Sequence, residues 1–425
     1  FFFSLFVFGL FLFHSVSYRT VVSNGLVLDK NGNKMSKRLG NVVDPFKTIN
    51  TYGPDATRWY LVTNASPWDS LKFDEKGIEE CQRKLFNTLF NTYTFFALYA
   101  NVDGFTYQEA FIPVTERPEI DQWILSSLNS LIQLCNEHFN DYEPTRAGRA
   151  IDDFVDEHLS NWYVRLCRRR FWKGEYEQDK ISAYQTLYEC LSTLCKLMAP
   201  ISPFFSDWLF QRLNEITKKE EALSVHHCLY PQADINLIQT ELEARMQLAQ
   251  DASSLILSLR KKANIKVRQP LQKVLIPALN ATLEERIRSV EEIIQSEVNI
   301  KEIEFLDADN TLIRKKVKAN FKELGARMGQ RMKDVASRIA QFSQFEISQL
   351  EAEGRLNLPL ETGPAEIFLQ NVEISSDDIP NYLVSNKRSL TVALDIQLSD
   401  VLIQEGLARE FVNKVQKLRK DLDFA

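Results

Sequence analysis

The 425-residue sequence lacks the paired cysteines and histidines that most zinc sites require. Its six cysteines are scattered singly with no CxxC pair, and the adjacent His226 and His227 have no cysteine or carboxylate at ligand spacing. A structural zinc site is therefore not expected, and no residue is assigned as a metal ligand. Single cysteines in a chain of this length indicate reduced thiols, so we expect a cytoplasmic protein.

The sequence also lacks an apolar run long enough to cross a membrane. The most apolar run is FFFSLFVFGLFLF at the start of the chain. As a helix it would reach only about 20 Å, against a hydrocarbon core of about 30 Å. No cation precedes it, as a signal peptide would require, and the first methionine is Met35. We therefore expect a buried helix whose covering partners lie upstream of Phe1, in a longer protein of which this chain is one part.

An excess of positive charge is absent too. The net charge of −6 gives no overall attraction to nucleic acid, so any such affinity must come from local basic patches. The chain length predicts about two or three domains.

The hydrophobic pattern changes along the chain and predicts a mixed fold. Residues 1–39 are predicted as a helix, a strand over residues 21–28 and a basic loop, as at the end of a Rossmann-type α/β domain. Residues 40–80 form a connector, 81–235 an all-α bundle and 236–425 a small α+β region that ends in a helix. Helices are expected at residues 79–100, 117–139, 144–173, 179–198, 202–216, 236–263 and 402–422. Strands are expected at residues 273–279, 300–306, 366–374 and 390–396.

The loop DKNGNKMSKRLGN holds Lys30, Lys34, Lys37 and Arg38 and follows the predicted strand directly. Ligands of open α/β sheets bind beyond the carboxyl ends of the strands. Glycines let the backbone bend, and lysine is a mobile point charge suited to phosphate oxygens. The loop can therefore close over a triphosphate and stabilise charge on a departing pyrophosphate. The alternative is a solvated lysine loop.

The order of residues in this loop resembles a known family. KMSKR after an apolar strand is similar to the KMSKS loop of class I aminoacyl-tRNA synthetases. NGLVLDKNGNKMSKRLGNVVDPFKTINTYGPDATRWYLV resembles isoleucyl-tRNA synthetases, and the likeness continues to residue 425. The resemblance implies that Lys37 is the principal contact to ATP, that Lys34 assists and that Ser36 helps to hold the loop. Met35 and Arg38 complete the ATP-binding segment, with Arg38 in place of the usual final serine, and Mg²⁺ would accompany ATP.

A second cluster, NWYVRLCRRRFWKG, is the densest mixture of basic and aromatic residues. On a helix, Asn161, Arg165, Arg168 and Trp172 fall on one stripe. Arginine and tryptophan can contact phosphates and stack on unpaired bases. The resemblance places this segment in the anticodon-binding domain. The residues it implies for tRNA binding are Asn161, Trp162, Arg165, Arg168, Arg169 and Trp172.

The alternative for this cluster is structural. Both tryptophans would then lie in the core, and the arginines would pair with nearby carboxylates. Those carboxylates are Asp152, Asp153, Asp156 and Glu157. Basic runs at residues 260–271 and 313–333 resemble the same family's C-terminal region, and each could equally be a solvated face.

The His-x-Gly-His signature of class I synthetases does not occur in the sequence. This chain alone is therefore not expected to activate an amino acid. The resemblance implies a parent isoleucine–tRNA ligase that acts on ATP and isoleucine, binds tRNA(Ile), has no membrane contact and is a monomer. A valyl- or leucyl-tRNA synthetase and a non-catalytic tRNA-binding module remain alternatives.

Overall fold

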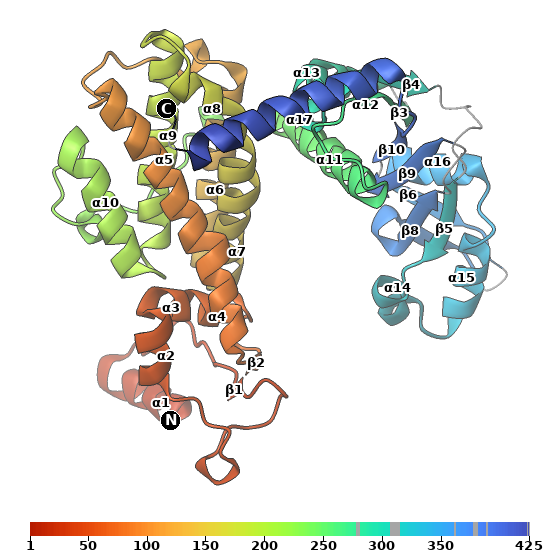
Figure 1. The fold of residues 1–425 in the computed structure, drawn as a ribbon. Coiled ribbons are helices and arrows are strands. Elements are labelled where there is room, and N and C mark those ends of the chain that lie inside the picture. The colour runs from red at the N-terminus through yellow and green to blue at the C-terminus, as the bar shows by residue number, and fades with distance from the viewer. Residues whose placement is uncertain are drawn as a thin grey trace. The chain divides into compact units, whose positions relative to one another are not determined.

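The computed structural model describes residues 1–277, 281–306, 315–360, 363–376, 381–387, 390–422 and 424. These residues fall into two compact units, Phe1–Thr240 and Glu241–Ala425 (Figure 1). The end of the strand predicted at residues 273–279 and the start of the basic run at residues 313–333 lie outside the described residues. The predicted fold class, an α/β start followed by a helical bundle and an α+β region, is confirmed.

The first unit begins with the predicted apolar helix α1 (Phe2–Phe13). Most of its large side chains are exposed, with Phe3 at 79% and Phe11 at 77%. The side chains of Ser17 and Tyr18 donate hydrogen bonds to its carbonyl groups. The expected burial of this helix by partners upstream of Phe1 stays a prediction. No helix among the described residues is long and apolar enough to span a membrane.

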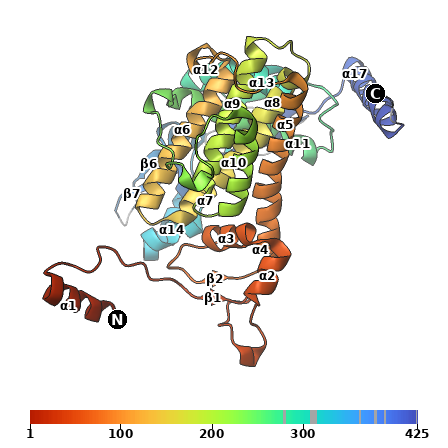
Figure 2. The same cartoon turned by 90° about the vertical axis from the view of Figure 1, so that its left-hand side faces the viewer.

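The strand predicted at residues 21–28 is much shorter in the structure. Only β1 (Val27–Leu28) forms, paired in parallel with β2 (Leu71–Lys72) beneath α3 (Pro54–Thr63) and α4 (Glu75–Cys81) in Figure 2. A strand needs a neighbour to receive its backbone hydrogen bonds, and the described residues provide one only at this end.

The connector consists of three short helices that link this pair of strands to the bundle. Asp44 caps the first helix through the backbone N–H groups of Phe46 and Lys47, and Gly53 adopts a φ of +85° between the first two. The helices are α2 (Pro45–Tyr52), α3 (Pro54–Thr63) and α4 (Glu75–Cys81).

The bundle confirms the predicted helices, with ends within a few residues of the expected breaks. Proline begins α7 and α10, where the missing N–H is no loss. The fully buried side chains include Trp123, Phe171 and Tyr184. The helices, labelled in Figure 1, are α5 (Asn87–Asp103), α6 (Glu119–Asn140), α7 (Pro144–Asp153), α8 (Arg165–Trp172), α9 (Gln178–Met198) and α10 (Pro203–Thr217).

Two π-helical segments interrupt the α-helical hydrogen bonding. The segment η2 (Gln82–Phe86) joins α4 to α5, and η4 (Phe154–Val164) joins α7 to α8. In a π-helix the backbone bonds run from i to i+5, and such segments are frequent at functional sites. Residues 144–172 therefore form one continuous helical rod whose middle is wound more loosely than its ends.

The second unit contains a four-stranded sheet with the order β4-β3-β10-β9. β3 and β4 are parallel, whereas β10 is antiparallel to both β3 and β9. The strands are β3 (Leu271–Pro277), β4 (Ile300–Leu306), β9 (Tyr382–Lys387) and β10 (Leu390–Asp395). The helices of this part are α11 (Thr240–Lys262), α12 (Ala281–Ser289), α13 (Glu291–Val298) and α17 (Asp400–Asp421).

Between β4 and β9 the chain builds a separate small layer with its own hydrophobic core. Buried side chains of this core include Leu324, Ile339, Leu350 and Ile367. Its strands are β5 (Lys315–Ala319), β6 (Arg355–Leu358), β7 (Ala365–Phe368) and β8 (Val372–Ser376), paired β5 with β8 and β6 with β7. Its helices are α14 (Phe321–Met328), α15 (Met332–Ile339) and α16 (Gln344–Glu353).

Candidate functional site

Asp29 closes the first half of the loop after β1 into a hairpin. Its Oδ1 accepts hydrogen bonds from the backbone N–H of Asn31 at 2.9 Å and of Asn33 at 2.8 Å. Gly32 turns the chain with a φ of +87°, in the left-handed region that favours glycine. The hairpin brings Lys34 back beside the end of β1, where it forms an antiparallel bridge.

A single 3-10 turn, η1 (Lys37–Leu39), carries the remaining cations of the loop. Ser36 precedes the turn, and its Oγ accepts a hydrogen bond from the backbone N–H of Leu39 at 3.3 Å. Gly40 ends the turn with a φ of +64°. Ser36 therefore holds the loop through the backbone, and Lys37 and Arg38 are placed on one turn.

The basic side chains of this loop are open to solvent. Lys34, Lys37 and Arg38 are all exposed. In the described part of the chain, no carboxylate forms an ion pair with any of the three. Two lysines and an arginine that form no ion pair within the described residues, placed on a short loop, can bind a multiply charged anion such as a triphosphate. Their contact with ATP stays a prediction.

The second cluster starts in η4 and continues into α8. The Asn161 side chain donates to Asp156 Oδ1 at 2.7 Å, five residues earlier, as the π-helical winding brings residues five apart together. Trp162 is only 4% exposed, and its indole lies 5.9 Å from the guanidinium of Arg165. The side chain of Trp162 thus lies in the core of the bundle, and its expected contact with tRNA stays a prediction.

The remaining residues expected to bind tRNA face solvent. Arg165, Arg168, Arg169 and Trp172 are exposed, Trp172 at 53%. The Arg168 guanidinium lies over the ring of Phe95 on α5, 6.0 Å from its centroid. The structural alternative, in which both tryptophans lie in the core, therefore holds for Trp162 but not for Trp172. The exposed set presents cations beside flat rings, the combination that binds single-stranded nucleic acid.

Arg170 points the opposite way from its neighbours and ties α8 to α6 and α9. Its guanidinium donates to both carboxylate oxygens of Asp121, at 2.7 and 2.8 Å, and to Ser182 Oγ at 3.0 Å. The Tyr163 hydroxyl donates to the same carboxylate at 2.8 Å, and Asp179 forms a second ion pair with Arg170 at 3.0 Å. Burial opposes the charge of Arg170, but the hydrogen bonds to Asp121 outweigh it and raise the pKa of Arg170 above its ordinary value.

Sequence reasoning missed two features of this surface. The first is the aromatic pair Phe95 and Tyr99 on α5, whose ring centroids lie 5.0 Å apart, with Phe95 beneath Arg168. The i, i+4 spacing of these two aromatic residues was a signal that could have identified the pair from the sequence. The inward orientation of Arg170 had no such signal, because its partner Asp121 lies 49 residues away in the sequence.

The basic run at residues 260–271 is partly structural. Arg260 is 1% exposed, and burial lowers its pKa to about 10. Its guanidinium stabilises the turn after α11 by donating hydrogen bonds to backbone carbonyl groups rather than to a carboxylate. The acceptors are the carbonyl oxygens of Lys266 (3.2 Å), Gln269 (2.9 Å) and Asn299 (2.8 Å). Arg268 lies 3.7 Å from Glu410, so this part of the run is also paired.

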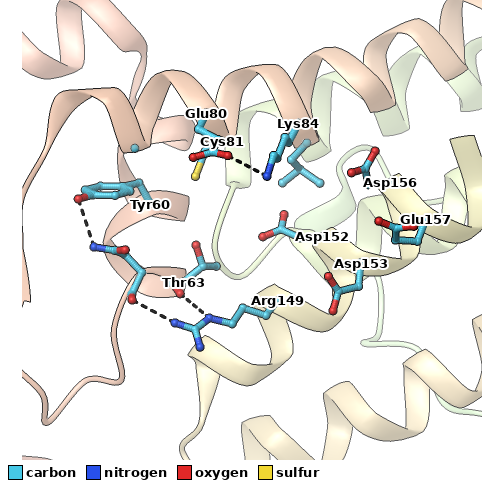
Figure 3. Close-up of a pocket in the computed structure, with 13 residues that line it drawn as sticks. Tyr60, Thr63, Glu80, Cys81, Lys84, Arg149, Asp152, Asp153, Asp156 and Glu157 are labelled. Carbon is cyan, nitrogen blue, oxygen red and sulfur yellow. Dashed lines mark hydrogen bonds and ion pairs between the residues drawn. The ribbon is translucent and has the colours of Figure 1, made fainter. Parts of the chain in front are cut away.

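A pocket of about 490 Å³ lies within the first unit, between the connector and the helical rod at residues 144–172 (Figure 3). Asp152 accepts hydrogen bonds from Trp59 Nε1 at 3.0 and 3.2 Å, and burial raises its pKa to about 7. Lys84 pairs with Glu80 at 2.8 Å. The remaining acidic lining residues are Asp153, Asp156 and Glu157. Because this lining is negatively charged, it would repel the phosphates of ATP or RNA. The pocket is instead a polar contact region between the connector and the bundle.

The described residues contain no group of three or more His, Cys, Asp or Glu side chains arranged to hold a metal ion. All six cysteines are free thiols. Burial raises the pKa of Cys167 to about 12 and that of Cys81 to about 11, so neither is a reactive thiolate near neutral pH.

Comparisons with known proteins match the two segments of the chain that carry these basic clusters. A family model described as "tRNA synthetases class I (I, L, M and V)" matches residues 1–74, which include the basic loop. A second model, "Anticodon-binding domain of tRNA ligase", matches residues 121–275, which include the cluster on η4 and α8. The chain belongs to the class I tRNA synthetases.

Curated members of this family are similar to the chain along its whole length. The isoleucine–tRNA ligase of Bacteroides fragilis is 55% identical over 423 residues, covering 100% of this chain and 37% of that protein. The corresponding ligase of Porphyromonas gingivalis is 54% identical, with the same coverage. That of Clostridium novyi is 38% identical, covering 100% of this chain and 40% of that protein. The synthetase chain thus spans less than half the length of these relatives.

Proposed function

We propose that the protein is an isoleucine–tRNA ligase. It would activate isoleucine with ATP, release pyrophosphate and transfer the aminoacyl group to tRNA(Ile). The observation that carries this proposal is the 55% identity over the whole chain to a protein named isoleucine–tRNA ligase. The match includes the loop whose cations have no counter-charge among the described residues. Six scattered free thiols agree with a cytoplasmic location, and we propose a monomer.

The loop at residues 29–41 would bind the phosphates of ATP. Lys37 would be the principal contact, and Lys34 would assist from the hairpin. Both are exposed lysines on a backbone held by Ser36 and Asp29, so their ammonium groups can follow the phosphates as charge develops on the departing pyrophosphate. Met35 and Arg38 would complete the segment, and Mg²⁺ would enter with ATP.

The exposed face of η4 and α8 would hold the anticodon arm of tRNA. Arg165, Arg168 and Arg169 would contact phosphates, and Trp172 would stack on an unpaired base. Asn161 is exposed but donates to Asp156, so its free carbonyl oxygen would be the contacting atom. Trp162 would support the face from inside the bundle.

Charging assays with the whole protein test the identity directly. We expect isoleucine to be joined to tRNA(Ile) in the presence of ATP, and valine, which is smaller by one methylene group, to be joined about 100-fold less efficiently. Leucine, an isomer that branches at a different carbon, should also be joined less efficiently than isoleucine. Preferred charging of valine or leucine would identify a sister synthetase. Tight tRNA binding with no ATP-dependent charging of any of the three would identify a non-catalytic tRNA-binding module.

A further inference from the structure

The carboxamide of Asn41 lies between the two halves of the phosphate-binding loop. Its Nδ2 donates to Asp29 Oδ2 at 2.9 Å and to the carbonyl oxygen of Lys34 at 3.3 Å. Its Oδ1 accepts from the backbone N–H of Ser36 at 2.9 Å. One side chain thus joins the hairpin that carries Lys34 to the turn that carries Lys37.

The same contacts engage both oxygens of the carboxylate in this loop, that of Asp29. Asp29 is occupied by two backbone N–H groups at Oδ1 and by Asn41 at Oδ2. The hydrogen bond from Asn41 is the largest of the effects that lower the pKa of Asp29, so the carboxylate stays ionised without an ammonium partner. Lys34 and Lys37 form no ion pair among the described residues and remain available to an external anion.

We propose that Asp29 and Asn41 form a clasp that positions Lys34 and Lys37 for the triphosphate. The inference rests on the proposed function, because it assumes that this loop binds ATP. Neither residue needs to touch the substrate. With the clasp open, the hairpin and the turn would move independently, and the two ammonium groups would spend less time at the separation that the phosphates require.

Reciprocal exchange of the two side chains tests the clasp. In Asn41→Asp two carboxylates face each other, whereas Asp29→Asn combined with Asn41→Asp restores a donor and an acceptor with the roles reversed. In this double variant the introduced amide oxygen can still accept from the backbone of the hairpin, and the introduced carboxylate can still accept from Ser36. Asn31→Asp is the matched control, because it adds the same charge to the loop at an exposed side chain outside the clasp.

Limited trypsin digestion reports on the loop itself, since trypsin cleaves after Lys34, Lys37 and Arg38. We expect Asn41→Asp to be cleaved there about 10-fold faster than the unchanged protein, the effect of losing one hydrogen bond to a charged group. Asn31→Asp should change the rate less than about 2-fold, and the exchanged double variant should return to within about 3-fold of the unchanged protein. Equal cleavage of Asn41→Asp and Asn31→Asp, or no recovery in the double variant, would overturn the clasp.

Pyrophosphate exchange in the whole protein separates positioning from simple stability. We expect Asn41→Asp to lower kcat for isoleucine activation about 10-fold, with an unchanged KM for isoleucine and unchanged tRNA affinity, and the double variant to recover most of the rate. A normal kcat in Asn41→Asp, alongside a large loss in Lys37→Ala, would refute the clasp but leave the ligase function intact. A normal rate in both variants would refute the role of the loop in ATP binding.

Discussion

Replacing Asp152 by asparagine should stabilise the protein at neutral and alkaline pH and change its stability little at acid pH. The Asp152 carboxylate accepts from Trp59 Nε1, and burial raises its pKa from 3.8 to about 7. The folded protein therefore holds this proton more tightly than the unfolded chain, so folding stability falls as the pH rises from about 4 to about 7. Asparagine keeps an acceptor for Trp59 and removes the buried charge.

The magnitude follows from the difference between the two pKa values. That difference corresponds to about 4 kcal/mol above pH 7. Solvent that reaches the pocket screens part of this cost, so we expect a gain of about 2 kcal/mol at pH 8. For a unit of this size the gain should raise the melting temperature by about 6 °C.

Thermal unfolding, followed by circular dichroism at pH 4.5 and at pH 8, measures the change in stability at each pH. Glu157→Gln is the control, because it removes one negative charge from an exposed side chain of the same pocket. It should change stability by less than about 1 kcal/mol at either pH. Destabilisation by Asp152→Asn at pH 8, or an equal gain at both pH values, would show that the buried carboxylate is not the cause.

Two further substitutions concern α8. Arg170→Met should destabilise the protein by about 3 to 5 kcal/mol, measured by urea unfolding. The reason is that the Asp121 side chain, which is 0% exposed, loses its ion-pair partner. A loss of stability below about 1 kcal/mol would contradict this. Arg168→Ala should instead leave stability unchanged and weaken tRNA binding in the whole protein, with the slope of log affinity against log salt concentration reduced by about 1. The matched control is Arg212→Ala on α10, another exposed arginine, and an equal loss of affinity in that variant would argue against a specific role for Arg168.

The helices of the bundle could be predicted from the sequence because prolines and polar breaks separate amphipathic runs of the right length. The strand before the basic loop was predicted too long. Its residues have the composition of a strand, but a strand forms only where a neighbour pairs with it, and β2 offers two residues.

The direction of side chains in η4 and α8 was harder to predict. A helical period of 3.6 residues placed Asn161 on one stripe with three later residues, but the π-helical winding turns it toward Asp156. Arg170 acts through Asp121, 49 residues away in the sequence, and Asn41 acts through residues of its own loop that only the loop's conformation brings together. Composition and spacing therefore located the basic clusters, whereas the division into solvent-facing and structural cations required the structure.

The most direct test of the account is isoleucine-dependent pyrophosphate exchange by the whole protein and its Lys37→Ala variant, with tRNA affinity measured in parallel. Lys47→Ala, which removes an exposed lysine from α2, serves as the control. The account predicts that Lys37→Ala lowers the exchange rate at least about 100-fold, as expected for loss of a charge that stabilises the transition state, and binds tRNA normally. An unchanged exchange rate in Lys37→Ala would contradict the assignment of the loop to ATP.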